Sequence, residues 1–302
     1  MTGFICLDKP KGITSFSAVG IVRRAVGEKK AGHTGTLDPM ATGVLPIARG
    51  GATRFIELFN THDKAYEAKI QLGITTDTLD ITGTVIKTED CFVTKGELLE
   101  VLEKFKGDIK QIPPMYSALK KDGVRLYELA RKGEEIEREE RDVTVYKLEL
   151  LDFDEENQEF TISVDCSAGT YIRTLSDDIG KTLGCGATLT ALRRTKALGF
   201  TIEDCVTEDE LKEIASDNRT QEILVSVEKA MQYKKIIVTD SQGKRFKNGG
   251  YLETQRLRTK VKEGEYYKVC SQSGDFAGIG EVSEDGEKLN VKRVYMGDAK
   301  NG

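Results

Sequence analysis

The residues best suited to chemistry stand in one glycine-rich segment, GHTGTLDPMATGVLPIARG, at residues 32–50. Its one acidic side chain, Asp38, lies between a glycine-threonine turn and an apolar run, and His33 stands five positions before it. Glycines permit sharp bends and a close approach of the backbone to a ligand. Pro39 restricts Asp38 to extended geometry, and a bare Asp-Pro pair is typical of a turn or a helix N-cap. The segment is therefore either a plain turn or a loop that presents a carboxylate for catalysis.

Other kinds of catalytic site have weaker support. GHTGT looks like a phosphate-binding loop, but it lacks the Gly-Lys-Ser/Thr ending of such loops. His62 has no serine or cysteine nucleophile elbow near it. The six cysteines include no Cys-x-x-Cys pair, and two histidines are too few to complete a zinc site with them. We therefore expect reduced thiols, no metal and no cofactor.

The pattern of apolar residues predicts the elements that hold Asp38. Residues 3–8 suit a buried strand, and the apolar spacing over 15–27 predicts a helix. Asp38 then falls on a loop that leads into a strand at 43–50, and loops on a rigid scaffold are where chemistry usually sits. A further strand is predicted at 64–73.

The middle of the chain predicts one more helix and a hairpin. Residues 94–107 have helical spacing, and Thr94 with Glu97 forms a capping box at the start. Two alternating runs, at 143–153 and 159–166, are separated by polar residues and predict a β-hairpin.

The second half adds helices and a charge run. A short amphipathic helix is predicted within 169–184, and the charged residues 134–142 indicate a solvated surface. A capping box at 207–210 begins an acidic helical connector that we expect to reach about residue 230. From 231 onward, short strands, turn glycines and basic residues predict a small barrel.

The segment at 32–50 closely resembles the catalytic motif of the tRNA pseudouridine synthase B family, whose hallmark is GHTGTLDP followed by ATG and an apolar strand. The resemblance continues in order and spacing through LDKPKGITS (7–15), KAYEAKIQLG (64–73), QIPPMYSALKKDGVRLYELARKG (111–133), CSAGTYIRTLSDDIG (166–180) and ALRRT (191–195). The chain is therefore identified as a member of this family.

The resemblance implies an α/β (α+β) fold with two domains. Residues 1–230 would form the catalytic domain around a mixed, mainly antiparallel sheet. An insertion at about 108–145 would clasp an RNA stem-loop and be mobile without RNA. Residues 231–302 resemble, more weakly, a PUA domain, a small RNA-binding β-barrel.

The function implied by the family is the conversion of uridine 55 in the T-loop of tRNA to pseudouridine. The target base must be extruded before Asp38 can reach it. The carboxylate can attack ribose C1′, attack base C6, or support a glycal-type intermediate, and the residues do not choose between these routes. A buried carboxylate needs a cationic partner to stay ionised. The resemblance assigns this partner to Arg173, from which we expect a bidentate contact. It also assigns Tyr66 as the catalytic tyrosine that lies against the base.

Four further residues are placed around the substrate by the resemblance. His33 would fill the space that the extruded base leaves, and Tyr171 would line the pocket with its backbone available to uracil. Leu192 would supply an apolar wall. Lys9, with Pro10, would brace the catalytic loop beside the substrate.

The chain is acidic as a whole, but its charges are unevenly distributed along the sequence. The formal net charge is −5, which is unexpected for a protein that binds a polyanion. Residues 203–228, however, carry a net −7, whereas residues 243–262 carry a net +6. A focused basic surface is compatible with specific RNA binding. We expect the T-arm of tRNA as partner, no obligate protein partner, and a monomer. The absence of a long apolar run and of a signal peptide pattern leads us to expect a cytoplasmic protein outside membranes.

Three other functions share some of these features. The catalytic subunit of an RNA-guided synthase has the same motifs, although the 108–145 insertion and the acidic pI favour a standalone enzyme. A non-catalytic RNA-folding chaperone would use the same surface, but it would not need Asp38, Tyr66 and Arg173 together. A nucleoside hydrolase would release free uracil, whereas the synthase would not.

Overall fold

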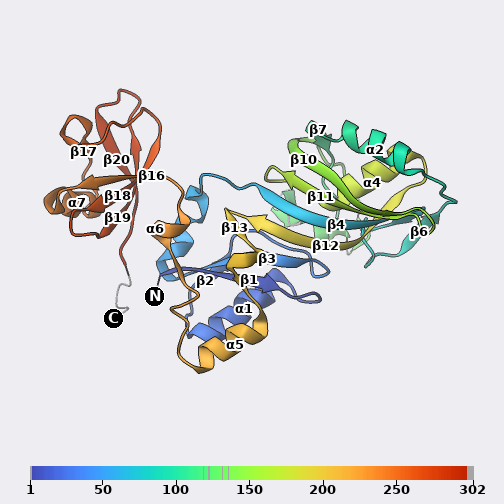
Figure 1. Ribbon diagram of the computed structural model, residues 1–302, viewed down its shortest axis with the longest axis horizontal. Helices are drawn as coiled ribbons and strands as arrows, with labels where there is room; N and C mark the ends of the chain where they lie inside the picture. Colours follow the sequence, from blue (N-terminus) through green and yellow to red (C-terminus); the bar gives the residue numbers. More distant parts are fainter. Residues whose placement is uncertain (1, 118, 122, 131, 135, 298–302) are drawn as a thin grey trace.

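The computed structural model describes residues 2–117, 119–121, 123–130, 132–134 and 136–297. Figure 1 shows an elongated molecule in which a small C-terminal sheet lies beside one end of a large sheet. The large sheet has eleven strands, in the order β14-β1-β3-β12-β4-β11-β10-β7, with β2, β13 and β15 paired beside this path. Its strands are β1 (Gly3–Lys9), β2 (Ala31–His33), β3 (Thr42–Arg49), β4 (Lys64–Leu72), β7 (Gly107–Gln111), β10 (Arg141–Asp154), β11 (Glu159–Cys166), β12 (Ala187–Ala197), β13 (Phe200–Thr201), β14 (Cys205–Val206) and β15 (Val225–Ser226).

The large sheet is mixed and mainly antiparallel, which confirms the predicted fold class. β4 pairs antiparallel with both β11 and β12, and β1 pairs antiparallel with β3. The exceptions are the parallel pairs β12–β3 and β1–β14. β12 pairs in parallel with β3 on one side and antiparallel with β4 on the other. Residues of β3 and β4 are therefore brought together across β12.

The helices predicted within 15–27, 94–107 and 169–184 and the hairpin are present. The first helix is held by a side-chain cap at Thr14 and ends at Gly27 in the left-handed region. The capping boxes at Thr94 and Thr207 are both formed. The helices are α1 (Ser15–Val26), α2 (Lys95–Lys104), α3 (Leu126–Ala130), α4 (Ile172–Leu183), α5 (Glu208–Ser216), α6 (Val227–Ala230) and α7 (Asp240–Lys247), with 3-10 turns at η1 (Gly50–Leu58), η2 (Ile202–Asp204) and η3 (Thr254–Arg256).

The acidic connector differs from the prediction of a helix to about residue 230. The α5 helix ends at Ser216, and Asn218 adopts a left-handed φ of 58° that turns the chain back. The strand β15 then pairs antiparallel with β1, and only the short helix α6 follows. Pairing with the sheet edge thus replaces helix in a stretch whose acidic composition alone had indicated a connector.

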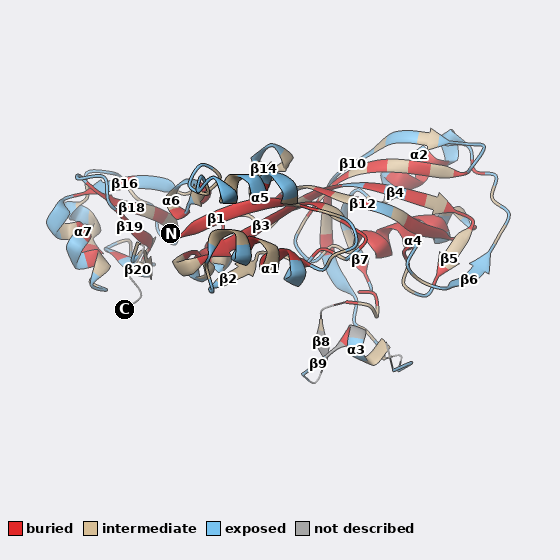
Figure 2. Ribbon diagram, turned by 90° about the horizontal axis from the view of Figure 1, so that it is seen from below, coloured by how far each residue is buried: buried red, intermediate tan, exposed pale blue. Residues whose placement is uncertain are grey.

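The region of the predicted insertion leaves the body of the protein. It carries the two-stranded pair of β8 (Lys120–Lys121) and β9 (Val124–Arg125), followed by α3. Figure 2 shows these elements projecting away from the large sheet. A second two-stranded pair, β5 (Ile74–Thr76) with β6 (Val85–Thr88), lies at the far end of β4. The charge run at 134–142 is largely exposed in its described residues, as predicted; residue 135 lies outside them.

The C-terminal region forms a sheet of its own. Its order is β16-β18-β19-β20-β17, built from β16 (Lys234–Val238), β17 (Leu252–Glu253), β18 (Tyr266–Ser271), β19 (Phe276–Val282) and β20 (Lys288–Val294). The sheet curls into a half-barrel, consistent with a PUA-like fold. An aromatic cluster joins it to the large sheet, with the Phe55 ring 6.4 Å from Phe276 and 6.3 Å from Tyr295 between centroids. Among the described residues, we find no helix with the length and apolar character needed to span a membrane.

Gly43 gives a direct test of the packing of β3 on β12. Its φ is +102°, and a Cβ there would lie 2.2 Å from the Arg194 carbonyl oxygen. At Gly184, φ is +83° but no atom lies within 4 Å of an added Cβ. We expect Gly184→Ala to lower the free energy of unfolding by about 1 kcal/mol, and Gly43→Ala by at least about 3 kcal/mol. Urea denaturation of both variants measures the difference. Equal losses would contradict the close approach of β3 to β12.

Candidate active site

Asp38 lies on the loop between β2 and β3, and the backbone on both sides of it is fixed. The Ser15 hydroxyl accepts from the Leu37 amide at 2.8 Å and donates to the Leu37 carbonyl at 3.1 Å. The Pro39 carbonyl accepts from the Gly12 amide at 2.8 Å. The Ala41 amide donates to the Asp38 carbonyl, so that Asp-Pro forms a turn rather than a helix start. The Asp38 side chain is 33% exposed. The loop thus presents one carboxylate to solvent from a rigid base.

Arg173, in the first turn of α4, forms an ion pair with Asp38. Its Nε lies 2.9 Å from Asp38 Oδ2, and its side chain is only 6% exposed. The two terminal nitrogens donate to carbonyls, at 3.3 Å to Thr78 and 2.8 Å to Tyr116. The contact is therefore made through Nε alone, and the bidentate contact that we expected is wrong. The guanidinium is held in place by backbone groups before any substrate arrives.

A second carboxylate, Asp80, approaches the same nitrogen of Arg173. Asp80 Oδ2 is 3.7 Å from Arg173 Nε, and its side chain is 5% exposed. It also accepts hydrogen bonds from the Thr78 hydroxyl and the Thr82 amide, each at 2.9 Å. We did not predict Asp80 as a site residue. Its segment, TTDTLDITG, has the threonines and aspartates of an ordinary surface turn.

The surroundings of Asp38 act on its pKa in opposite directions. Burial of the carboxyl group raises the pKa, and the Arg173 charge lowers it. Asp80 raises it further, Lys9 lowers it, and the net direction is upward. Arg173 thus offsets part of the cost of keeping an ionised carboxylate in this position.

Tyr66 on β4 lies directly opposite Arg194 on β12. Burial raises the pKa of Tyr66 to about 12, and the Arg194 guanidinium opposes this rise. Tyr66 therefore remains a neutral phenol near pH 7. Arg194 is completely buried and donates to the carbonyls of Val44, Thr36 and Gly35, at 2.8, 3.3 and 3.2 Å. Arg194 joins both ends of the Asp38 loop to β12, although the sequence had indicated it only as part of the ALRRT segment (191–195).

Lys9 and His33 flank the same loop. Lys9 is completely buried, and its ammonium donates to the carbonyls of Pro10, Ile13 and Pro39 at 2.9, 2.8 and 3.4 Å. Burial lowers the pKa of Lys9 to about 8, and the Asp38 charge opposes this. His33 ends β2, and burial and the Arg194 charge lower its pKa. Its Nδ1 is buried and has no hydrogen-bond partner among the described residues.

Tyr171 is the residue before α4, and Leu192 lies on β12 two residues before Arg194. Leu192 is 8% exposed and pairs with Ala68 across the strands. The Tyr171 amide donates to Gln111 Oε1 at 3.0 Å, and its carbonyl accepts from Gln111 Nε2 at 3.3 Å. The expectation of a free Tyr171 backbone is therefore wrong for this structure. The amide of Gln111 occupies both groups, a contact between distant segments that no local pattern indicates.

Comparison with known proteins gives a family match over most of the chain. Residues 23–172 match the model described as TruB family pseudouridylate synthase, N-terminal domain. Residues 173–232 match the model of the tRNA pseudouridylate synthase B C-terminal domain. Asp38 and Tyr66 fall in the first region, and Arg173 begins the second.

Curated relatives and solved structures are similar along nearly the whole chain. tRNA pseudouridine synthase B of Ectopseudomonas mendocina (strain ymp) is 44% identical over 299 residues, covering 98% of this chain and 96% of the relative. The protein of the same name from Clostridium tetani (strain Massachusetts / E88) is 44% identical over 291 residues, covering 96% and 98%. A chain in the crystal structure of a Cbf5-Nop10-Gar1 complex has a TM-score of 0.74 and 27% identity, covering 97% of this chain and 85% of that one.

The opposing charges around Asp38 predict how its pKa responds to substitution. Arg173→Met removes the opposite charge, so the pKa of Asp38 should rise; Asp80→Asn removes a like charge, so it should fall. Carbon-13 NMR titration of labelled aspartate carboxyls measures both shifts, with Asp38→Asn identifying the resonance. Shifts of the same sign in the two variants would contradict the opposing effects of Arg173 and Asp80 on Asp38.

Proposed function

Because the chain belongs to the TruB family of pseudouridylate synthases, we propose that it acts on the uridine at position 55, in the T-loop of tRNA. Its activity is the isomerisation of uridine in tRNA to pseudouridine. The observation that carries the proposal is a partly exposed carboxylate, Asp38, held at 2.9 Å by the buried guanidinium of Arg173 within the matched region. The near full-length relatives favour this function over an RNA-guided subunit, a chaperone or a hydrolase.

The reaction exchanges one bond to the ribose for another. The bond between N1 and C1′ breaks, the base turns in the pocket, and a bond between C5 and C1′ forms. One proton leaves C5 and one is gained at N1, so the reaction is redox-neutral. In our proposal Asp38 is the catalytic carboxylate, by attack on C1′, attack on C6, or support of a glycal. Arg173 keeps it ionised without having to move, because its terminal nitrogens already bind the carbonyls of Thr78 and Tyr116.

Tyr66 is proposed to pack against the target base and to take part in proton transfer at C5. Stacking of a base on an aromatic ring contributes about 1–3 kcal/mol, which is enough to orient the base. With a pKa of about 12, the phenol enters each turnover with its proton in place. It therefore suits orientation and proton donation better than direct abstraction as a phenolate.

The remaining residues are proposed to shape the pocket. The uridine must be extruded from the folded loop, and His33, a flat ring with an unpartnered buried nitrogen, is placed to fill the vacated space. Leu192 supplies an apolar wall, and Tyr171 lines the pocket with its ring. Lys9 acts as a brace, since its ammonium is fully used by three carbonyls of the loop region.

The division of labour along the chain is part of the same proposal. Residues 1–230 form the catalytic domain, and the projecting segment at about 108–145 clasps the RNA stem-loop. Residues 231–302 form a PUA-like RNA-binding domain, supported by the basic segment 243–262. We propose that the T-arm of tRNA is the partner of a monomeric enzyme that acts in the cytoplasm.

The role of Asp38 is tested by Asp38→Asn, which keeps the size of the side chain and removes its charge. We expect pseudouridine formation on unmodified tRNA transcript to fall at least about a thousandfold, while RNA binding persists. Carbodiimide block to reverse transcription maps the product, and a parallel assay for free uracil tests hydrolysis. Substantial conversion by Asp38→Asn, or release of uracil by the wild type, would contradict the proposal.

The role of Arg173 is tested by Arg173→Lys. A lysine keeps the charge, but its ammonium cannot reach Asp38 while replacing the contacts to Thr78 and Tyr116. We expect the single-turnover rate to fall by about tenfold or more, with tRNA affinity within about twofold of wild type. Full activity of Arg173→Lys would mean that charge alone is sufficient and that the fixed guanidinium is not needed.

A further inference from the structure

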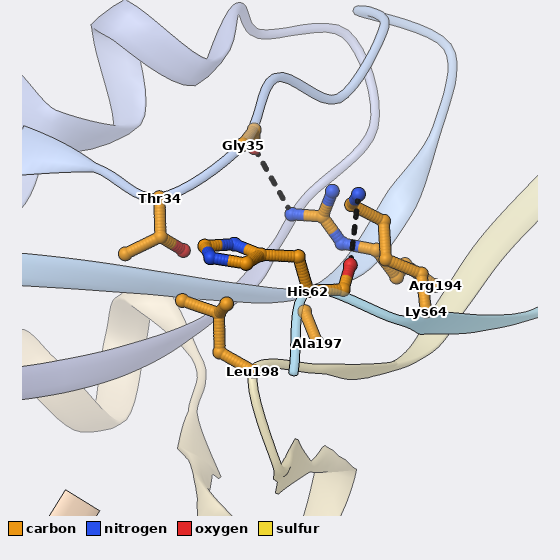
Figure 3. A pocket seen from close by; sticks show the side chains of 7 residues that line it. All are labelled: Thr34, Gly35, His62, Lys64, Arg194, Ala197 and Leu198. Carbon is orange, nitrogen blue, oxygen red and sulfur yellow. Dashed lines mark hydrogen bonds between the residues drawn. The ribbon is translucent and has the colours of Figure 1, made fainter. Parts of the chain in front are cut away.

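A small polar pocket lies beside the catalytic loop, away from the Asp38 carboxylate. It is lined from the loop by Thr34 and Gly35, from the start of β4 by His62 and Lys64, and from β12 by Arg194. Figure 3 shows the basic ends of Lys64 and Arg194 beside each other near Gly35, with the His62 ring between Thr34 and Leu198. The cavity is about 10 Å³, which is room for roughly one water-sized group.

The positive charge around this pocket has no matching carboxylate. Arg194 is completely buried, and its guanidinium donates to three backbone carbonyls and lies beside the neutral Tyr66 hydroxyl. The Lys64 ammonium donates to the His62 carbonyl at 3.3 Å. In the part of the chain that the structure describes, no Asp or Glu oxygen lies within 4.0 Å of either side chain. Carbonyls satisfy donors but carry no net charge, and a buried cation without a counter-ion is costly.

The two cations also act on each other. Burial lowers the pKa of Lys64, and the Arg194 charge lowers it further. Asp63 opposes this, but its carboxylate accepts a hydrogen bond from the Tyr146 hydroxyl at 3.3 Å, on the outer side. Like charges that face a shared polar space, with little compensation from the protein, are the arrangement expected of an anion site.

Gly35 keeps the space between these side chains open. A Cβ at this position would lie 3.7 Å from Lys64 Cε and 3.8 Å from Arg194 Nη1. Any longer side chain would therefore fill the pocket. Because the cavity holds only one water-sized group, it can take a single oxygen of a phosphate whose other atoms remain at the mouth.

The pocket is formed by the same strands and the same loop as the candidate active site. Lys64 and Tyr66 are two residues apart on β4, so their side chains lie on the same face of the sheet. Arg194 is the cross-strand neighbour of Tyr66, and Gly35 precedes Asp38 by three residues on the loop. An RNA backbone that delivers a base to Asp38 and Tyr66 would pass this opening.

We propose that Lys64, Arg194 and His62 form a subsite for one non-bridging oxygen of the RNA phosphate next to the reacting uridine. This inference rests on the proposed function, because it takes RNA as the substrate. The guanidinium and the ammonium supply the charge, and the imidazole supplies a further N–H donor. The subsite fixes the backbone beside the extruded base while Asp38, kept ionised by Arg173, acts on the sugar or the base.

The test pairs a protein variant with a chemically neutral phosphate. T-arm stem-loops are made with one methylphosphonate linkage, moved one position at a time across the loop, and binding is measured for the wild type and for Lys64→Met. Lys69→Met is the matched control, since Lys69 lies on the same strand but on the exposed face. We expect one linkage beside the target uridine to weaken wild-type binding about three- to tenfold, and to have less than about a twofold effect on Lys64→Met. Lys69→Met should respond like the wild type.

Salt dependence provides a second measure on the same proteins. Loss of one phosphate contact should reduce the slope of log K against log [salt] by about 0.7–1 in Lys64→Met and leave it unchanged in Lys69→Met. His62→Ala, which removes a donor but leaves the buried Arg194 and the half-buried Lys64 in place, guards against misfolding of Lys64→Met. It should show the same sensitive linkage with a smaller effect.

Two results would overturn the inference. The first is that every linkage affects the wild type and Lys64→Met equally. The second is that inorganic phosphate, at equal ionic strength to chloride, saturates a site lost in Lys64→Met while no linkage is coupled to Lys64; the pocket would then take free phosphate. Pseudouridine formation by the wild type is measured separately. A wild type that forms pseudouridine but shows no coupled linkage overturns only this inference, whereas one that forms none overturns the proposed function.

Discussion

An ionised carboxylate that is largely surrounded by protein needs a cation that stays in place, and Arg173 supplies this cation to Asp38 at 2.9 Å. The guanidinium can do so because it is itself held by the carbonyls of Thr78 and Tyr116. Asp80, at 3.7 Å from the same nitrogen, partly balances the charge of Arg173 and raises the pKa of Asp38. The site is thus a cluster of one cation and two carboxylates, assembled before substrate binds, in which Asp38 is the most exposed member.

The fold assembles this site by placing segments that are distant in the sequence on the two sides of β12. The parallel pairing of β12 with β3 fixes the catalytic loop on one side, and the antiparallel pairing with β4 places Tyr66 on the other. Arg194 joins the two, because its donors reach Gly35, Thr36 and Val44 while its charge acts on Tyr66. The same residue stabilises the loop and leaves a positive charge beside it. In the subsite that we propose, this buried positive charge also attracts an RNA phosphate, although the protein as a whole is acidic.

The features that were best predicted from the sequence are those set by short-range interactions. The caps at Thr94 and Thr207 and the hairpin at 143–166 formed because their signals are short-range. Asp38 and Arg173, 135 positions apart, were placed together by resemblance rather than by any pattern in the residues. Asp80 and the Gln111 contact to Tyr171 were missed because each depends on long-range packing. The connector after Ser216 was misjudged because pairing of β15 with the edge of β1 outweighs helical composition.

The central claim is that Asp38 reacts as a carboxylate whose ionisation depends on Arg173. The most direct test is the single-turnover rate of pseudouridine formation against pH for the wild type and Arg173→Met. Without Arg173 the pKa of Asp38 rises, so the acid limb should move to higher pH, and alkaline conditions should restore part of the lost rate. A rate in Arg173→Met that is reduced equally at every pH would contradict this account and would leave Arg173 with a purely structural role.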